Sequence, residues 1–476
     1  MIKKLLKNTL FFGLAPYVPK IVSVFLLPIM TKYLTATDYG IAGTIDAYTQ
    51  ALTAFSTLGF TTVLSVIFFR AKQQYKILWR EIYGFLQYWM IIFAIIQATL
   101  LYFVIPKEAE EYKWWIILFT NFSNVFFGPT AVLGNLYYVS SMKPLPVVSR
   151  SIIGGITTIL ANYILVVHYR LGYFGWYVGG FIGTFLINAS YWYTVNIQLN
   201  LKPIFNFKRK TILKYLKIAL PTIPHYYCVY MMNTSSKVIM NIQSIPLNII
   251  GQTNLVLQIG GIIESWINAM NQAINPMAMN EIRNKNEDKA KTLILLYYII
   301  TLSCTFLFSL WCKEIFHILI SNEELAETYP YAIVFVMALN YRPPYVAASN
   351  MFFFHENTSS LMKISFIAGL IAVISYIILI PLFGVWGVVV GFYISSFYMG
   401  YSGFLMKQFK SKTKVDYPYL RLLSTHLIAT ILVLKLVNLD IHWKLFTCFL
   451  LLFSFIIILK CKKNQHHEVY TKIFNK

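Results

Sequence analysis

The sequence predicts an all-α polytopic membrane protein with about fourteen transmembrane helices. Three observations support this fold class: 58% of the 476 residues are hydrophobic, only 12% are charged, and the mean hydropathy is +0.61. Soluble domains carry about twice that share of charged residues. At about 20 apolar residues per crossing, the chain has little length left for a soluble domain, which disfavours most enzymes.

Hydrophobic runs of spanning length occur along the whole chain. The first six lie near residues 9–30, 41–69, 82–105, 114–141, 147–168 and 172–195. The other eight lie near residues 216–240, 247–279, 292–312, 329–354, 361–381, 384–406, 419–437 and 443–459. We therefore expect an N-terminal lobe over 1–200, a C-terminal lobe over 201–414, and two further spans with a basic cytoplasmic tail over 415–476.

The formal net charge is +22, from 40 basic and 18 acidic residues. In a soluble protein this excess would suggest nucleic acid, but polytopic membrane proteins concentrate Lys and Arg in their cytoplasmic loops. With the N-terminus placed inside, thirty basic residues fall in predicted cytoplasmic segments and seven in external ones. We expect both termini in the cytoplasm and no nucleic-acid partner.

The sequence carries no motif for metal binding or nucleotide hydrolysis. Its five cysteines form neither a CxxC pair nor a Cys/His set with metal-binding spacing. No Walker-type phosphate-binding loop occurs, so ATP hydrolysis by this chain is not expected. We predict no metal, no cofactor and no catalytic residue.

Two short motifs of the first half recur in the second half. They pair Pro16 and Pro19 with Pro221 and Pro224, and Gly172, Gly175 and Gly179 with Gly384, Gly387 and Gly391. Because a six-span repeat has an even number of crossings, both copies enter the membrane in the same orientation, as in many transporters. The prolines predict bending or unwinding of the first and seventh spans beside a cavity, or a static kink.

Five ionisable residues lie inside predicted spans: Lys20, Asp46, Lys237, Glu264 and Arg342. Each would cost about 2.5 to 3.5 kcal/mol at the middle of a bilayer, so we expect them to face a hydrated interior. Four of them fall in spans 1, 2, 7 and 8, the first two spans of each predicted repeat. Three positive and two negative groups predict a mildly cationic substrate-binding cleft that suits a phosphate or diphosphate head group.

Two other interpretations of these charges stay open. Asp46 and Lys237 lie nearer the external ends of their spans, where a side chain can reach the interface. Alternatively, pairing of Lys20 with Asp46 and of Lys237 with Glu264 would compensate the charges inside the bundle.

Polar residues in the seventh and eighth spans suggest further roles. His225 follows the second proline pair and, with Glu264, is a candidate for proton coupling, because imidazole titrates near neutral pH. Ordinary hydrogen bonding is the alternative for His225. The eighth span also carries eight polar side chains, which predict that it lines a cavity: Gln252, Asn254, Gln258, Glu264, Asn268, Asn271, Gln272 and Asn275.

The opening of the chain carries a recognisable pattern. Lys7-Asn8-Thr9 and Gly13 are followed by Leu27-Pro28-Ile29-Met30-Thr31-Lys32-Tyr33-Leu34 and Asp38-Tyr39-Gly40. This pattern resembles the opening of Wzx-type O-antigen and capsular repeat-unit flippases, in the multidrug/oligosaccharidyl-lipid/polysaccharide (MOP) exporter superfamily. The later segments Ile380-Pro381-Leu382-Phe383-Gly384-Val385-Trp386-Gly387 and Tyr329-Pro330 are similar to landmarks of that family, so the resemblance covers nearly the whole chain.

The resemblance implies a MATE-like fold of two pseudo-symmetric six-helix lobes plus two C-terminal helices, with a cavity lined by helices 1, 2, 7 and 8. It implies alternating access that moves an undecaprenyl-diphosphate-linked oligosaccharide across the bacterial cytoplasmic (inner) membrane for surface polysaccharide biosynthesis. The implied partners are that glycan, the lipid bilayer and the polysaccharide polymerase machinery. Within the opening motif, Pro28 and Gly40 are expected to shape the turn between helices 1 and 2.

Other functions stay open on the sequence. A lipid II flippase shares the diphosphate chemistry, and a cation-coupled multidrug extruder of the same superfamily would use an acidic cavity. A membrane polysaccharide polymerase or acyltransferase would need a sizeable external loop or an ordered acid/base set, and neither is visible. Proton or sodium coupling, or downhill flux drawn by consumption of the product, would supply the energy.

Overall fold

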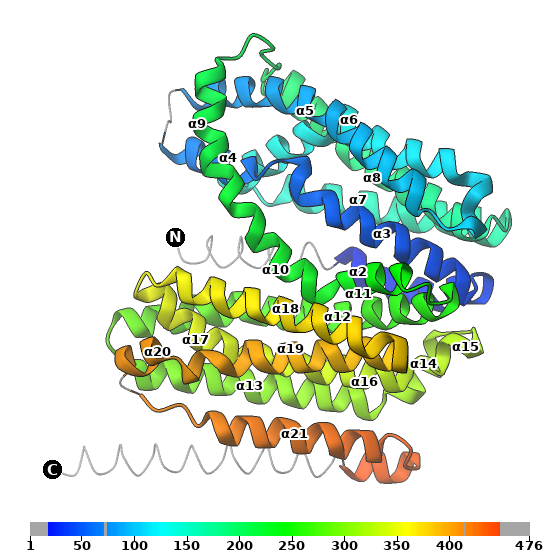
Figure 1. Cartoon of the computed structure of the whole chain (residues 1–476), viewed down its shortest axis with the longest axis vertical. Coiled ribbons are helices and arrows are strands. Elements are labelled where there is room, and N and C mark those ends of the chain that lie inside the picture. Colours follow the sequence, from blue (N-terminus) through cyan, green and yellow to red (C-terminus); the bar gives the residue numbers. More distant parts are fainter. Residues whose placement is uncertain (1–17, 71–73, 414, 448–476) are drawn as a thin grey trace.

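A computed structural model describes residues 18–70, 74–413 and 415–447, and the regular elements in these ranges are helices (Figure 1). The α-helices of the first half are α2 (Val18–Tyr33), α3 (Ala36–Ser56), α4 (Phe60–Arg70), α5 (Tyr75–Val104), α6 (Lys113–Ser140), α7 (Leu145–Asn162), α8 (Gly172–Tyr193), α9 (Arg209–Ala219), α10 (Ile223–Asn233) and α11 (Ser235–Ile242). Those of the second half are α12 (Leu247–Arg283), α13 (Glu287–Leu310), α14 (Cys312–Leu319), α15 (Glu323–Ala326), α16 (Tyr329–Ala338), α17 (Arg342–Phe354), α18 (Thr358–Phe383), α19 (Val385–Leu405), α20 (Lys407–Lys412) and α21 (Tyr419–Leu436).

Each of the first thirteen predicted spans contains at least one of these helices. The fourteenth, 443–459, is helical as far as residue 447 and otherwise lies outside the described residues. Eight helical segments of the described part are long and apolar enough to cross a membrane. Spans divided into short helices, such as α10 and α11 or α16 and α17, are not among these eight, and neither is the long α12, which carries many polar side chains.

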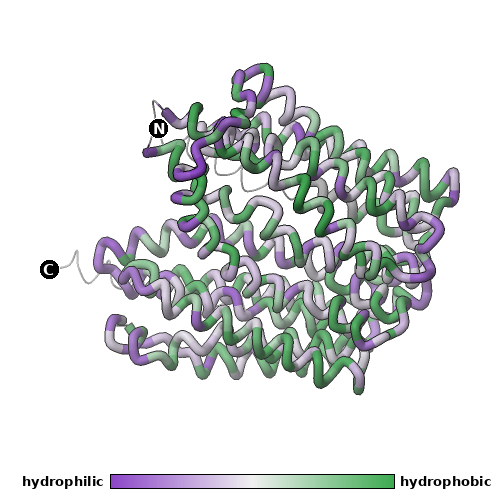
Figure 2. Tube along the Cα trace, turned by 45° about the horizontal axis from the view of Figure 1, so that its top comes forward, coloured by the Kyte–Doolittle hydropathy of each residue, from purple (hydrophilic) through white to green (hydrophobic). Residues whose placement is uncertain are grey.

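The distribution of hydropathy fits a protein that spans a bilayer. Figure 2 shows hydrophobic residues along the middle of the helices and hydrophilic residues concentrated at their two ends. Large apolar side chains are exposed on the outside of the helices, including Ile95 at 64% and Phe103 at 79% exposure. In water such a surface would be costly, whereas hydrocarbon is its natural solvent. The all-α polytopic fold class is therefore confirmed.

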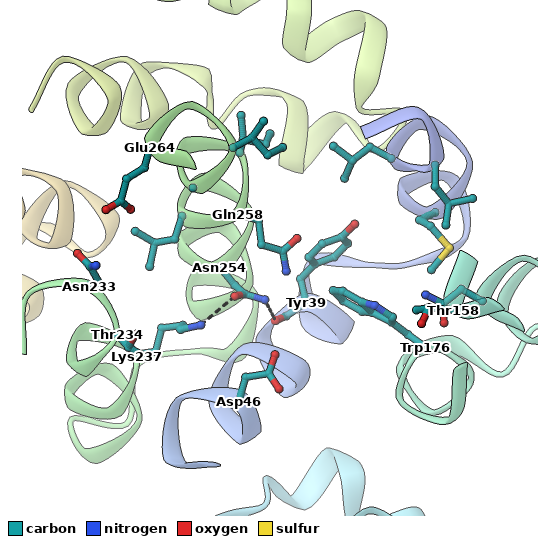
Figure 3. Close-up of a pocket in the computed structure, with 18 of the residues that line it drawn as sticks. Tyr39, Asp46, Thr158, Trp176, Asn233, Thr234, Lys237, Asn254, Gln258 and Glu264 are labelled. Atoms are coloured by element: carbon teal, nitrogen blue, oxygen red, sulfur yellow. Dashed lines mark hydrogen bonds between the residues drawn. The ribbon is translucent and has the colours of Figure 1, made fainter. Parts of the chain in front are cut away.

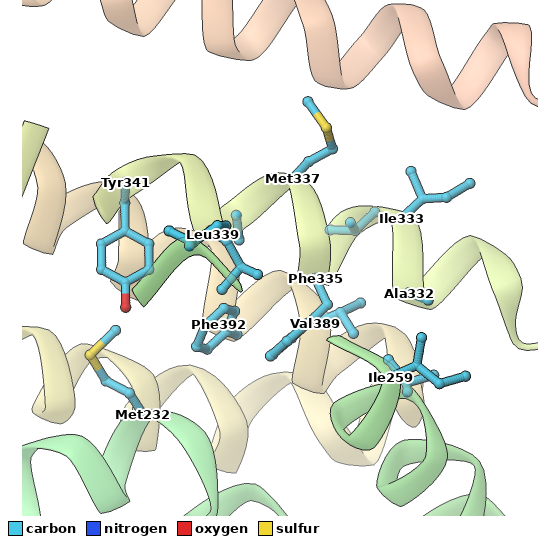
Figure 4. Close-up of a cluster of buried hydrophobic side chains, with 14 of the residues drawn as sticks. Met232, Ile259, Ala332, Ile333, Phe335, Met337, Leu339, Tyr341, Val389 and Phe392 are labelled. Atoms are coloured by element: carbon cyan, nitrogen blue, oxygen red, sulfur yellow. The ribbon is translucent and has the colours of Figure 1, made fainter. Parts of the chain in front are cut away.

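The helices form two bundles that are separated over part of their length (Figure 1). We call α3 to α8 the N-terminal bundle and α12 to α21 the C-terminal bundle. The core of the C-terminal bundle is rich in aromatic contacts, and the rings of Phe335 and Phe392 stack with centroids 4.4 Å apart (Figure 4). The helices α14 and α15 lie at the end that the charge bias predicts to be external, and α20 lies at the opposite end.

The glycine repeat has equivalent structural roles in the two bundles. Gly172 precedes the body of α8 with φ of +53°, and Gly384 precedes α19 with φ of +56°. Both values lie in the region that disfavours residues with a Cβ atom. These two glycines let the chain reverse between α7 and α8 and between α18 and α19.

The next glycine of each motif allows close helix packing. A Cβ atom at Gly175 would lie 3.0 Å from the carbonyl oxygen of Leu165, and one at Gly387 would lie 2.5 Å from that of Leu379. Small residues of this kind permit helix backbones to approach each other in a membrane. The repeated sequence motif therefore corresponds to a repeated helix hairpin.

The seventh predicted span is broken at its prolines. A 3₁₀ turn, Leu220–Thr222, separates α9 from α10, and the Thr222 hydroxyl donates to the Ala219 carbonyl oxygen at 2.7 Å. Although α9 lies beyond residue 200, Ile212 and Ala219 pack in a core of the N-terminal bundle. In the first span, Pro19 is the second residue of α2, and Pro16 lies outside the described residues.

The expected role of Pro28 and Gly40 in the turn between the first two spans is wrong. Pro28 lies inside α2 and Gly40 inside α3. The turn is stabilised instead by a capping box, in which Thr35 and Asp38 bond each other's backbone N–H groups. Gly40 faces α12, because a Cβ atom there would lie 1.9 Å from the Leu247 carbonyl oxygen.

Substitution Gly384→Ala should lower the stability of the protein by about 1 to 3 kcal/mol, because alanine is strained at this positive φ. Thermal unfolding in detergent measures the effect. Gly180→Ala is the matched control, since nothing lies within 4 Å of its Cβ position inside α8. Equal unfolding temperatures of the two variants would contradict the assigned role of Gly384.

Candidate functional site

A cavity of about 670 Å³ lies between the two bundles. Spans 1, 2, 7 and 8 line it, as expected, through α2, α3, α10 to α12 and the residue between α10 and α11. Helices α7, α8 and α16 also contribute, which the sequence interpretation did not include. Polar or aromatic lining residues are Tyr39, Asp46, Gln50, Thr158, Asn162, Trp176, Asn233, Thr234, Lys237, Asn254, Gln258, Glu264 and Phe335.

The bundles contact each other closely at the predicted external end of this cavity. A Cβ atom at Gly251 of α12 would lie 1.8 Å from the Ala36 carbonyl oxygen of α3. Nearby, Ser321 donates its backbone N–H to the Thr31 hydroxyl at 2.9 Å and its own hydroxyl to the Pro28 carbonyl oxygen at 2.8 Å. Helices α2 and α3 are thus held against the C-terminal half of the chain at this end.

A second seam joins α10 to the later part of α3. Three tyrosine hydroxyls of α10 donate to backbone carbonyl oxygens of α3: Tyr226 to Gln50 at 3.3 Å, Tyr227 to Ala51 at 2.5 Å and Tyr230 to Ala47 at 3.2 Å. These bonds add to the backbone hydrogen bonds of α3 and do not replace them. They place α10 along one side of the cavity.

Lys237 begins a chain of hydrogen bonds that runs through Asn254 to the other bundle. Its side chain is 6% exposed, and its Nζ atom donates to Asn254 Oδ1 at 3.0 Å (Figure 3). The Asn254 amide in turn donates to the Tyr39 carbonyl oxygen at 3.0 Å. Lys237 therefore does not reach an interface, and the alternative that placed its amine there is wrong.

Glu264 and Arg342 form an ion pair across the C-terminal bundle. An Arg342 terminal nitrogen donates to Glu264 Oε1 at 2.5 Å, and the side chains are 21% and 17% exposed respectively. The suggested pairing of Lys237 with Glu264 is therefore wrong. Arg342 opens α17 directly after a 3₁₀ turn, Leu339–Tyr341, because Pro343 and Pro344 cannot donate to the preceding carbonyls.

The guanidinium of Arg342 retains unused donor capacity. Its Nε atom is buried and has no hydrogen-bond partner among the described residues. The ring of Tyr341 lies 5.2 Å from the guanidinium carbon. Arg342 is held beside the cavity, since Glu264 lines the cavity and Arg342 itself does not.

Asp46 points into the same space as Lys237, beside Asn254 (Figure 3). No described residue gives its carboxylate a hydrogen bond or an ion pair. Asp46 and Trp176 also line a second cavity of about 360 Å³ between α3, α6 and α8. The buried hydroxyls of Thr49 and Ser123, which line this second cavity, have no partner among the described residues.

Two candidate residues have side chains outside the described part of the structure. They are Lys20, within α2, and His225, within α10, so the suggested pairing of Lys20 with Asp46 and the coupling role of His225 stay predictions. The described charged groups at the cavity are Lys237 and Arg342 against Asp46 and Glu264. These charges balance, and the expected positive excess depends on Lys20.

The sequence interpretation missed the contribution of spans 5 and 6. Thr158 and Asn162 lie one helical turn apart on α7, and Trp176 on α8 lies close to Tyr39, with ring centroids 4.9 Å apart. The sequence did contain a signal for this helix face: two neutral polar residues four positions apart within an apolar span predict a face that lines a cavity. Among the described residues, no group of three or more His, Cys, Asp or Glu side chains could hold a metal ion.

This arrangement of two bundles around a cavity is shared with solved membrane proteins. The lipid II flippase MurJ in an inward closed conformation superposes with a TM-score of 0.67 at 14% identity, over 90% of this chain and 98% of that chain. An inward-facing multidrug resistance MATE family transporter of the MOP superfamily gives 0.60 at 12% identity, over 88% and 96%. A mutant of the Vibrio cholerae MATE transporter VcmN gives 0.53 at 12% identity, over 88% and 98%.

These similarities establish the class of fold: over about nine-tenths of its length the chain has the architecture seen in MurJ and in the MATE transporter. No protein-family model and no curated protein matches the sequence. The fold therefore does not distinguish among the flippases and exporters that share it.

The Glu264–Arg342 pair should show strong coupling in a double-mutant cycle. Arg342→Gln and Glu264→Gln alone each leave a partly buried group without its partner, and the double substitution should recover about 1 to 3 kcal/mol of unfolding free energy. The Lys113–Glu110 pair, whose carboxylate side chain is 63% exposed, is the control and should show about 0 to 1 kcal/mol. Additive losses at Glu264 and Arg342 would contradict the coupling.

Proposed function

We propose that this protein flips a polyprenyl-diphosphate-linked oligosaccharide from the cytoplasmic to the external leaflet of a bacterial cytoplasmic membrane by alternating access. The observation that carries the proposal is the chemistry of the central cavity. Its lining combines amides, hydroxyls and aromatic rings with the buried amine of Lys237. Such groups suit sugar hydroxyls and a phosphate, whereas a polyprenyl tail can stay in the hydrocarbon.

Neutral polar side chains from both bundles supply the sugar-binding capacity. Gln50, Asn162, Asn233 and Gln258 come from α3, α7, α10 and α12 and all face the cavity. Their amide groups each offer donors and acceptors, which matches the alternating donors and acceptors of a carbohydrate. Trp176 and Tyr39 add aromatic rings, which offer apolar faces to sugar rings.

Lys237 and Arg342 are the proposed diphosphate contacts among the described residues. Lys237 uses one of its three N–H donors on Asn254, and Arg342 has an unpartnered Nε atom. A diphosphate that entered the cavity could accept from Lys237 directly. Contact with Arg342 would require its side chain to share or leave Glu264, which makes this ion pair a candidate for exchange during transport.

The names of the solved proteins that share this fold support transport over catalysis. The lipid II flippase is one of them, and a lipid-linked peptidoglycan precursor is therefore an alternative cargo with the same diphosphate chemistry. The Wzx-type assignment rests on the opening motif, Leu27-Pro28 to Asp38-Tyr39-Gly40. On this assignment the protein would act in surface polysaccharide biosynthesis, upstream of a polysaccharide polymerase. The bias of basic residues toward the predicted cytoplasmic segments supports a cytoplasmic location of both termini.

Asp46 favours a second candidate function. A carboxylate that has no hydrogen bond or ion pair among the described residues and lines two cavities is the kind of group that attracts an organic cation or a coupling ion. A cation-coupled multidrug extruder is therefore the second candidate. In either function, Glu264 and His225 are the proposed groups for proton or sodium coupling, and no other cofactor is proposed.

The decisive test is the fate of lipid-linked oligosaccharide in cells depleted of this protein. Accumulation of a complete repeat unit on the cytoplasmic leaflet would support the proposal, and its mass would identify the cargo. Accumulation of lipid II would assign the alternative cargo instead. Normal glycan export with altered resistance to organic cations would favour drug extrusion, and external but unpolymerised units would indicate an enzyme.

Substitution Lys237→Gln should reduce flipping about tenfold or more at unchanged abundance, because a charge-assisted hydrogen bond to phosphate is worth about 1.5 to 3 kcal/mol. Lys237→Arg should retain more activity, since it keeps the charge. Lys289→Gln in α13 is the control, because this exposed lysine lies away from the cavity. Leaflet accessibility of the accumulated cargo measures the effect, and full activity of Lys237→Gln would remove Lys237 from the site.

A further inference from the structure

Arg150 stands outside the central cavity and lacks a compensating carboxylate. It lies in α7 near the predicted cytoplasmic end, partly buried between the rings of Tyr138 and Tyr191, at 5.1 and 4.8 Å from its guanidinium carbon. Its three nitrogens donate to neutral groups only: Nε to the Ser190 hydroxyl, and the terminal nitrogens to the Pro146 carbonyl and the Thr194 hydroxyl, each at 2.8 Å. No ion pair joins Arg150 to a described acidic residue.

The positive charge of Arg150 is reinforced by the start of its own helix. Helix α7 begins after Pro144 without a side-chain cap and has no acidic residue in its first turn. The positive end of its dipole is therefore uncompensated. Lys143, exposed in the preceding turn, adds a second cation at this corner of the protein.

These groups meet at a surface cavity of about 610 Å³. Arg150 lines it together with Leu145, Ser149 and Gln198. A guanidinium has five N–H donors, and the bonds to Ser190, Pro146 and Thr194 use three of them, so two remain for a ligand. The cavity therefore combines a spare, oriented cation with the amide of Gln198 and the positive end of a helix dipole, which is an environment for a phosphate.

An apolar strip leads from this cavity toward the predicted middle of the membrane. Ile153, Ile156 and Leu160 are 56%, 47% and 57% exposed and recur at helical spacing on α7. Leu145, 64% exposed, begins the same strip beside the cavity. A ligand with an anionic head and apolar chains would satisfy both features at once.

We propose that the Arg150 cavity binds the phosphate head group of an anionic phospholipid of the inner leaflet, with its acyl chains along α7. The bound phosphate supplies the missing counter-charge for Arg150 and extends the contact between α7 and α8. This lipid site is separate from the cargo cavity. Its test reads lipid binding and not transport, so it can fail without affecting the proposed function.

Native mass spectrometry of the purified full chain tests the site, with phosphatidylglycerol and phosphatidylcholine of identical acyl chains as probes. We expect one phosphatidylglycerol to bind in preference, and Arg150→Gln to weaken this binding about fivefold. Leu145→Glu should weaken it similarly by repulsion, while it leaves the bonds of Arg150 intact and adds an acidic residue that favours the helix start.

Arg80→Gln is the matched control, because Arg80 lies at the same predicted end and donates to the Lys202 carbonyl oxygen at 2.8 Å without lining this cavity. It should retain the lipid preference. Equal binding of the two lipids, wild-type binding by both Arg150→Gln and Leu145→Glu, or equal loss in Arg80→Gln would overturn the proposal. Displacement of the lipid by millimolar inorganic phosphate would assign the site to a soluble anion instead.

Discussion

The architecture depends on the contact between α3 and α12 at the predicted external end. Two glycines, Gly40 and Gly251, allow the helix backbones to meet where any side chain would collide. In a membrane, where hydrocarbon competes with apolar side chains, such close backbone packing is a main source of helix association.

Asn254 links this contact to the cavity. Its side chain packs against Gly43 of α3, donates to the Tyr39 carbonyl oxygen and accepts a hydrogen bond from Lys237. Among the described residues, no ion pair joins α3 to α12. The two helices can therefore separate without leaving a buried charge without its partner.

The sequence predicted the spans well because hydropathy is a property of consecutive residues. It anticipated the break of the seventh span at its prolines. It did not predict the loop between α3 and α4 at Gly59, because an apolar run continues through that loop. It identified Asp46, Lys237, Glu264 and Arg342 as unusual by their cost in a bilayer, which needs no knowledge of packing. The sequence could not predict which of these residues pair. Glu264 and Arg342 are 78 residues apart and meet only because α12 and α17 cross. The choice of Asn254 as the partner of Lys237 likewise depends on how α11 lies beside α12.

The repeat is conserved in architecture and has diverged in chemistry. Gly172 and Gly384 make the same reversal in both bundles, but the N-terminal copy also receives a contact from Asp38, which accepts the Tyr173 backbone N–H at 3.1 Å. The described charged groups at the cavity are distributed unequally, with Asp46 in a span of the first predicted repeat and Lys237, Glu264 and Arg342 in spans of the second. A pseudo-symmetric scaffold therefore surrounds an asymmetric site. For the proposed transport, such a division is expected, because the scaffold would permit two related conformations while the cavity would recognise a cargo that has no such symmetry.

The seventh span links the two bundles mechanically. Its first part, α9, packs with Ile212 and Ala219 in a core of the N-terminal bundle, and Gly59 lets α4 approach the Ala219 carbonyl oxygen. Its later part, α10, packs along α18, and the hydroxyl of Tyr376 in α18 donates to the Met232 carbonyl oxygen at 2.6 Å. A change in the angle between the bundles must therefore bend the chain between these two anchored parts. The 3₁₀ turn Leu220–Thr222 lies at that point, and Pro221 has already removed one hydrogen bond of the helix there, so the bend would cost less than in an uninterrupted helix.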